Sequence, residues 1–333
     1  MANFYTPLAP TSQIDQGDPF VLTAPPTASY RYYIYTTGAN PPDGTAIPCY
    51  GTHDFTTVDF LGWCLVNALA ASHWAPCVQY LPGLQRPYVM LYSRAIGLGE
   101  QGHVGHHIRR ADSVTPEGPF EDSGHVLSPP EHDFAIDPDV YQLPNGQRMM
   151  GWATDFVHDV PLGTGIVEAP INSDLTQLLA APTVLARAVS DQQLYEENRY
   201  MPWKTIPGID WSRGDRAPKW YTVEAPVGLV SPQGRRVVLY STGNFSLPNY
   251  AVGALVETDT GELEDVTNTR GHFVVRSQPE SDLYALGHPS ALGTSALLIH
   301  MRKGVHGPRQ MALIPLLWTA DSVPYCPLAK DLA

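Results

Sequence analysis

The sequence has few basic residues and no long apolar run. Lysine and arginine total 20 against 33 acidic residues, the formal net charge is −13, and the basic residues form no cluster. Nucleic acid is excluded as a main ligand, because proteins bind its phosphates through basic patches. No segment approaches about 18 consecutive apolar residues, so we expect no membrane partner. The start MANFYTPLAP lacks the pattern of a signal peptide, which predicts a cytoplasmic protein, or a secreted one if a leader was trimmed.

Cysteine is also scarce. Cys49, Cys64, Cys77 and Cys326 follow no CxxC spacing, so we expect buried thiols rather than a zinc or thioredoxin-like site. The histidines within residues 103–107 fit no zinc pattern either, and we interpret them as solvent-facing. The phosphate-binding motif GxxxxGK and the nucleophile motif GxSxG are both absent.

Proline and glycine, by contrast, are abundant. The chain has 32 prolines and 28 glycines, too many for long helices, and Tyr, Val and Thr recur in short runs between turn signals. Hydrophobic residues make up 43% of the chain and charged residues 16%, which is sufficient for a packed core. We therefore predict an all-β fold, with helical character only over about residues 173–187.

A repeat organises these strands. Five segments share a short tag containing a proline, then an apolar strand, a turn and a second apolar or aromatic strand; the tags are GDPFVL, HWAPCVQYL, AIDPDVYQL, VEAPVGLV and LGHPSALG. Their prolines are Pro19, Pro76, Pro138, Pro226 and Pro289. Each unit has room for about four strands of 5–6 residues. Since each twisted sheet must cover both faces, radial closure is favoured. We predict a single-domain five-bladed β-propeller over residues 1–333.

Two parts of the chain modify the repeat. The third unit is longer than the others and contains an insertion at about 194–219, which we expect to form a loop over the rim of the central pocket. The last blade is expected to combine the two chain ends, with Gln310–Trp318 as a late strand.

The tags place chemistry on the propeller axis, because the innermost strands line the central channel. The residues just before the prolines include Asp18, Trp74, Asp137, Glu224 and His288. Confined carboxylates disfavour one another's ionisation, so such a cluster costs stability and indicates catalysis. Two carboxyl groups with separated pKa values are what glycoside hydrolysis requires, and an indole ring can stack on a sugar. Taken singly, Asp18 could be a turn residue and His288 a structural histidine.

These tags resemble those of glycoside hydrolase family 43. The similarity includes Asp18-Pro19, the WAP of residues 74–76, GPF at 118–120, IDP at 136–138, EAP at 224–226, Tyr240-Ser241, Gly287-His288 and Arg309–Trp318. It implies that Asp18 is the general base, Glu224 the general acid and Asp137 the carboxylate that tunes the acid. The implied reaction inverts the anomeric centre, with the two working carboxyls about 6.5–9.5 Å apart.

The resemblance also covers the binding groups. Trp74 and His288 would line the sugar site, no organic cofactor is required, and His288 could help hold a calcium ion through water. Two departures stand out: Ala225 follows the acid where glycine is common, and the insertion at about 194–219 directly precedes the acid.

The function predicted is removal of terminal α-L-arabinofuranosyl units from arabinose- or xylose-containing oligo- or polysaccharides. A β-D-xylosidase, an endo-arabinanase or another furanosidase of the family remains an alternative, as does a non-catalytic carbohydrate-binding propeller. A retaining fructan enzyme is disfavoured because Gly17 and Ile136, which precede Asp18 and Asp137, are not the residues that such enzymes have before these aspartates. A phosphorylase would need Arg199, Arg213 and Arg216 to bind phosphate. The sequence leaves the oligomeric state open.

Overall fold

The computed structural model describes residues 4–9, 15–38, 44–68, 72–96 and 105–332. In these ranges almost all regular structure is β-strand, and the one α-helix is the short α1 (Val266–Arg270). No helix among the described residues is long and apolar enough to span a bilayer. The prediction of an all-β fold is confirmed.

The helix expected over residues 173–187 is wrong. The segment begins with turns in which Asn172 Oδ1 accepts hydrogen bonds from the N–H groups of Thr176 and Gln177. It ends as strand β12 (Thr183–Arg187), which pairs with β11. Pro182 cannot donate within a helix, and the β-branched residues that follow it favour a strand.

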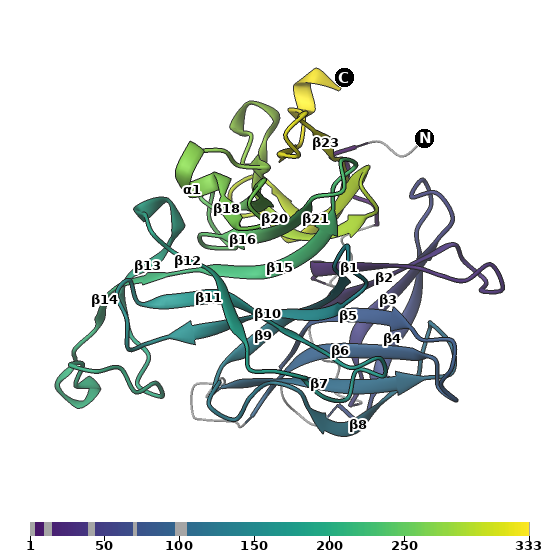
Figure 1. Ribbon diagram of the computed structural model, residues 1–333, viewed down its shortest axis with the longest axis horizontal. Coiled ribbons are helices and arrows are strands. Elements are labelled where there is room, and N and C mark those ends of the chain that lie inside the picture. The colour runs from purple at the N-terminus through teal and green to yellow at the C-terminus, as the bar shows by residue number, and fades with distance from the viewer. Residues whose placement is uncertain (1–3, 10–14, 39–43, 69–71, 97–104, 333) are drawn as a thin grey trace.

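The strands form five blades arranged around a centre (Figure 1), and parallel pairing of Leu65 with Phe120 joins the first two blades into one eight-stranded sheet. Blade I consists of β1 (Gly17–Thr23), β2 (Tyr32–Thr37), β3 (Ala46–Thr52) and β4 (Asp59–Val66). Blade II consists of β5 (His73–Tyr80), β6 (Tyr88–Ala95), β7 (His106–Ser113) and β8 (Phe120–Val126). Blade III consists of β9 (Ala135–Gln142), β10 (Arg148–Phe156), β11 (Gly163–Pro170) and β12. Blade IV consists of β15 (Val223–Val230), β16 (Arg236–Thr242), β17 (Ala251–Glu257), β18 (Leu263–Asp265) and the short β19 (Val275–Arg276).

Blade V draws on both ends of the chain. It contains β20 (Leu283–Leu292), β21 (Ala296–Lys303) and β22 (Gln310–Pro315), while β23 (Leu317–Trp318) and β24 (Pro324–Tyr325) form a separate ribbon. The N-terminal segment lies along β22: the N–H groups of Tyr5 and Leu8 donate to the carbonyls of Leu313 and Met311. The expectation that the last blade combines the chain ends is confirmed.

Buried apolar clusters fill the seams between the blades. One cluster lies at each of the five seams, including that between blades V and I, where Val21 and Ile34 meet Leu298 and Leu313. Every blade is thus covered on both faces by its neighbours. This closes the ring, and the structure is the five-bladed β-propeller that the repeat predicted.

The predicted insertion folds back on itself beside blade III. It contains β13 (Leu194–Arg199), a 3-10 turn over Trp211–Arg213 and β14 (Ala217–Tyr221), and β14 touches the end of β11. A small core of its own surrounds Met201, Ile206 and Trp220.

The five tags share an unusual backbone conformation. The residue before each tag proline has a positive φ: 50° at Asp18, 46° at Ala75, 58° at Asp137, 51° at Ala225 and 52° at His288. Few non-glycine residues adopt this left-handed region, and a following proline disfavours helical backbone further. The glycine that the family commonly has at position 225 would relieve this strain, whereas alanine keeps it.

Candidate active site

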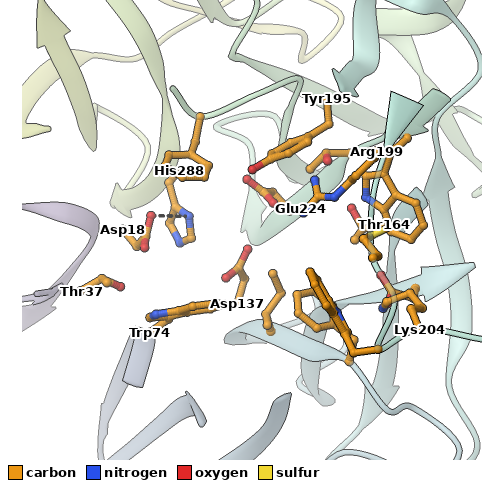
Figure 2. A pocket seen from close by; sticks show the side chains of 18 of the residues that line it. Asp18, Thr37, Trp74, Asp137, Thr164, Tyr195, Arg199, Lys204, Glu224 and His288 are labelled. Carbon is orange, nitrogen blue, oxygen red and sulfur yellow. Dashed lines mark ion pairs between the residues drawn. The ribbon is translucent and has the colours of Figure 1, made fainter. Parts of the chain in front are cut away.

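The predicted site residues converge on one pocket of about 410 Å³ at the propeller axis. Figure 2 shows Asp18, His288 and Trp74 on one side, Arg199 and Lys204 on the other, and Asp137 and Glu224 between them. All five residues singled out in the tags therefore line the pocket, as their equivalent places in the repeat predicted.

Asp18 lies among basic groups. Arg309 Nη1 donates to Asp18 Oδ1 at 2.9 Å, and His288 Nδ1 lies 3.2 Å from the same oxygen. The backbone N–H of Asp18 donates to His300 Nδ1. Burial alone would raise the pKa of Asp18, but Arg309 and the two histidines outweigh it and hold the pKa well below its usual value. Asp18 is an ionised carboxylate at neutral pH.

Glu224 has the opposite character. Burial raises its pKa to about 7, helped by the nearby charge of Asp18, although a hydrogen bond from Tyr250 to the carboxylate opposes the rise. Tyr250 Oη donates to Glu224 Oε1 at 2.7 Å. Glu224 can therefore carry a proton near neutral pH, as a general acid must.

Asp137 is held by two backbone contacts. Its own N–H donates to Ser93 Oγ at 3.0 Å, and its Oδ2 accepts the N–H of Ala225 at 3.1 Å. Burial raises the pKa of Asp137 well above its usual value, and the charges of Glu224 and Asp18 raise it further. Glu224 and Asp137 thus form a pair that resists carrying two negative charges.

Trp74 presents its ring to the pocket while stacking on His106, with ring centroids 3.9 Å apart. His106 is fully buried, so the interpretation of this histidine run as solvent-facing is wrong for His106. Packing against the indole explains its burial. His103, in the same run, lies outside the described residues.

The rim insertion supplies the wall of the pocket farthest from Asp18. Its contributions are Tyr195, Arg199, Met201, Trp203 and Lys204, followed by Trp220 on β14. The ammonium group of Lys204 forms an ion pair with Asp155 of β10, and both side chains are largely buried. Of the three arginines considered for phosphate binding, only Arg199 lines the pocket.

Sequence analysis assigned no role to three residues that contact the carboxylates, Arg309, Tyr250 and His300, although Arg309 begins one of the segments that carry the resemblance. Two glycines leave space for Arg309 and Tyr250. A Cβ atom on Gly17 would lie 1.9 Å from Arg309 Cζ, and one on Gly287 would lie 2.2 Å from Tyr250 Cε1. The glycine before the first and the last tag residue is a sequence feature that could have pointed to Arg309 and Tyr250.

The calcium ion implied by the resemblance finds little support in the residues present. Next to the pocket the axis holds a cavity of about 20 Å³, which has room for roughly one water molecule. Its lining includes the five tag prolines, His288 and three aspartates, Asp18, Asp137 and Asp139. Calcium takes about 6–8 oxygen ligands. Among the described residues, no three His, Cys, Asp or Glu side chains gather as a metal site. The site does not fit direct coordination, and a role for His288 through water stays a prediction.

Comparison with known proteins agrees with this geometry. A thermostable family-43 glycoside hydrolase has the same fold, with 18% identity, a TM-score of 0.71, and coverage of 95% of this chain and 93% of that chain. An endo-arabinase from Bacteroides thetaiotaomicron VPI-5482 has 16% identity and a TM-score of 0.64, with coverage of 96% and 99%. A xylan beta-1,4-xylosidase from Bacillus halodurans C-125 has 16% identity and a TM-score of 0.65, with coverage of 96% and 57%.

No curated protein matches the sequence. The family model of glycosyl hydrolases family 43 matches residues 8–324, nearly the whole chain. The tags, the closed ring of blades and the three axial carboxyl groups all lie within the matched segment, and the chain belongs to glycosyl hydrolase family 43.

Proposed function

We propose that this glycoside hydrolase is an exo-acting, inverting α-L-arabinofuranosidase. The observation that carries the proposal is the contrast between two half-buried carboxyl groups in one pocket. Arg309 keeps Asp18 ionised, whereas burial raises the pKa of Glu224 to about 7. A base and an acid that coexist near neutral pH are the two groups that inverting hydrolysis needs.

In the proposed reaction the glycosidic bond breaks and a bond from water to the anomeric carbon forms. Glu224 gives its proton to the leaving oxygen. Asp18 accepts a proton from the water that attacks the opposite face of the sugar. The charges of Asp137 and Glu224 repel each other, so in the proposed reaction Asp137 tunes the proton affinity of Glu224. Trp74 supports the sugar ring by stacking.

The rim insertion supports exo action. It covers the side of the pocket beyond Glu224 with Met201, Trp203 and Lys204, where the leaving group would lie after protonation. We propose that this wall limits the leaving group to a short part of the substrate. An open groove for a long polysaccharide would need this side uncovered.

The sugar is the finer part of the proposal, because similar solved structures include both an endo-arabinase and a xylosidase. Aryl α-L-arabinofuranoside, β-D-xylopyranoside, α-D-arabinofuranoside and β-D-galactopyranoside form the test panel. We expect turnover of the first, with a product that appears first as the inverted anomer by NMR. Turnover of the xyloside alone would show that the enzyme removes xylose rather than arabinose. No turnover of any of the four aryl glycosides, together with activity on arabinan, would indicate endo action.

Variants test the assigned roles. Asp18→Asn and Glu224→Gln should each lower kcat by about 10²–10⁴-fold on a natural linkage. On a substrate with an activated aryl leaving group, the loss of kcat in Glu224→Gln should be smaller, because such a leaving group needs less protonation. The matched control is Asp139→Asn, a half-buried carboxyl of the same tag, whose Oδ2 accepts the N–H of Gly228. A Glu224→Gln enzyme with wild-type activity on the natural linkage would exclude Glu224 as the acid.

A further inference from the structure

The same type of hydrogen bond occurs near the axis at four of the five seams. In each, a side chain on the second strand of one blade accepts the backbone N–H of the residue before the next tag proline. The acceptors are Thr37 for Ala75, Ser93 for Asp137, Ser241 for His288 and His300 for Asp18, at 2.7–3.2 Å. All four acceptors occupy the same place in the strand register, opposite Gly17, Trp74, Glu224 and Gly287 respectively.

The seam between blades III and IV is the exception. The equivalent residue, opposite Ile136 in the register, is Ala153, which has no acceptor in its side chain. The N–H of Ala225, the equivalent donor, instead reaches Asp137 Oδ2 at 3.1 Å. Both Ala153 and Ala225 are buried, so water does not readily replace the missing acceptor.

We propose that Ala153 is a positioning residue, and that its missing hydroxyl leaves the N–H of Ala225 to the Asp137 carboxylate. The side chain of Asp137 is thereby fixed to blade IV next to Glu224, while its backbone is fixed to blade II through Ser93. A serine at position 153 would restore the bond found at the other seams and release the carboxylate. The kinetic consequence rests on the role proposed for Asp137; the hydrogen bond itself does not.

A double-variant cycle on thermal unfolding tests the bond without any substrate. Asp137→Ala removes the acceptor and leaves the Ala225 N–H buried without a partner. Adding Ala153→Ser supplies a new acceptor, so it should raise the melting temperature of the Asp137→Ala protein by roughly 1–4 °C. In the wild-type background the same serine competes with Asp137 and should give no gain.

Ala153→Cys is the control, because a thiol adds a similar volume but accepts hydrogen bonds weakly. It should not rescue Asp137→Ala. If the Ala153→Ser protein does not fold but the Asp137→Ala/Ala153→Ser protein does, this outcome also supports the proposal, because the two substitutions then compensate each other. Equal effects of the serine in both backgrounds, or a double variant that does not fold, would overturn the proposal.

The pH profile gives a second readout, which a merely structural role would not move. The groups that act on Asp137 are Glu224, Asp18 and Arg309, and the Ala225 N–H favours its charged form. Losing this N–H in Ala153→Ser makes Asp137 easier to protonate, so it repels charge on Glu224 less. The alkaline limb of kcat/KM should move to lower pH in Ala153→Ser and stay in place in Ala153→Cys. An unmoved limb contradicts the positioning role; absence of any glycosidase activity contradicts only the proposed function.

Discussion

At the scale of single residues, the carboxyl groups of Asp18 and Glu224 differ through their partners rather than through burial. Asp18 and Glu224 are both half-buried residues that line the pocket, and removal from water raises the pKa of each. Asp18 has a guanidinium and two imidazoles around it, while Glu224 has a tyrosine hydroxyl. A strong positive partner reverses the effect of burial at Asp18 only, which gives the pocket one ionised and one protonated group.

Tyr250→Phe should widen the pH range of activity on the alkaline side. The Tyr250 hydroxyl donates to the carboxylate of Glu224 and so lowers the pKa of that group. Without it the pKa of Glu224 rises above about 7, and the alkaline limb of kcat/KM should move to higher pH. Tyr92→Phe is the control, because its hydroxyl bonds to Asp122 outside the pocket. A limb that moves to lower pH would show that Glu224 is not the proton donor.

Gly17→Ala should displace Arg309. The new methyl group would overlap the guanidinium, which must then move away from Asp18. The pKa of Asp18 rises, so the acidic limb should move to higher pH and kcat/KM should fall by about 10–100-fold. Gly83→Ala serves as the control, because a Cβ there meets no atom within 4 Å. Unchanged kinetics in Gly17→Ala would mean that Arg309 does not set the charge state of Asp18.

At the scale of elements, the strands that carry the tags could be predicted from the sequence. The structure of residues 173–187 could not, because a helix was expected where the segment ends as strand β12. Each tag proline lies on the innermost strand of a blade, and an apolar strand follows it in the sequence. This short pattern therefore predicts where each blade begins and which of its strands lies at the axis. The segment 173–187 has helical spacing of apolar residues, but Pro182 and pairing with β11 decide its structure. The roles of Arg309 and His300 escaped prediction because their contacts with Asp18 depend on how blade V meets blade I. The role of Tyr250 escaped prediction because its contact with Glu224 depends on how the strands of blade IV are arranged. Local sequence encodes neither arrangement.

The rim insertion should matter more for natural substrates than for aryl ones. The double variant Lys204→Met/Asp155→Asn removes the ion pair without leaving one charge alone. If the pair binds hydroxyls of the leaving sugar, kcat/KM on arabino-oligosaccharides should fall by about 10-fold or more, with little change on an aryl arabinofuranoside. Lys219→Met is the control, because Lys219 pairs with Asp191 at the exposed side of the insertion. Equal losses on both substrates would assign the pair to folding instead.

At the scale of the whole molecule, five apolar seams and the N-terminal segment hold the ring closed. Tyr5 is buried in the cluster between blades IV and V, and its hydroxyl donates to the carbonyl of Pro327 at 2.7 Å. Its backbone N–H pairs with β22. The N-terminal residues therefore contribute to closure without lining the pocket.

Tyr5→Ala should lower the free energy of unfolding by about 3–5 kcal/mol, as for other buried aromatic residues. Its effect on kcat at 25 °C should be small. Phe4→Ala, which removes a neighbouring ring that is 39% exposed, should be nearly neutral. Thermal or urea unfolding measures both variants. Similar stability of the two would mean that the N-terminal pairing adds little to closure.

The left-handed residues before the tag prolines have a consequence for how the enzyme fails. Five such residues surround the axis, and each costs roughly 1–3 kcal/mol that packing elsewhere must offset. A blade freed from its neighbours would let its tag relax to ordinary extended backbone, turning the carboxylate out of the pocket. Heat inactivation and loss of tertiary structure should therefore occur in the same temperature range, with no active but partly opened form.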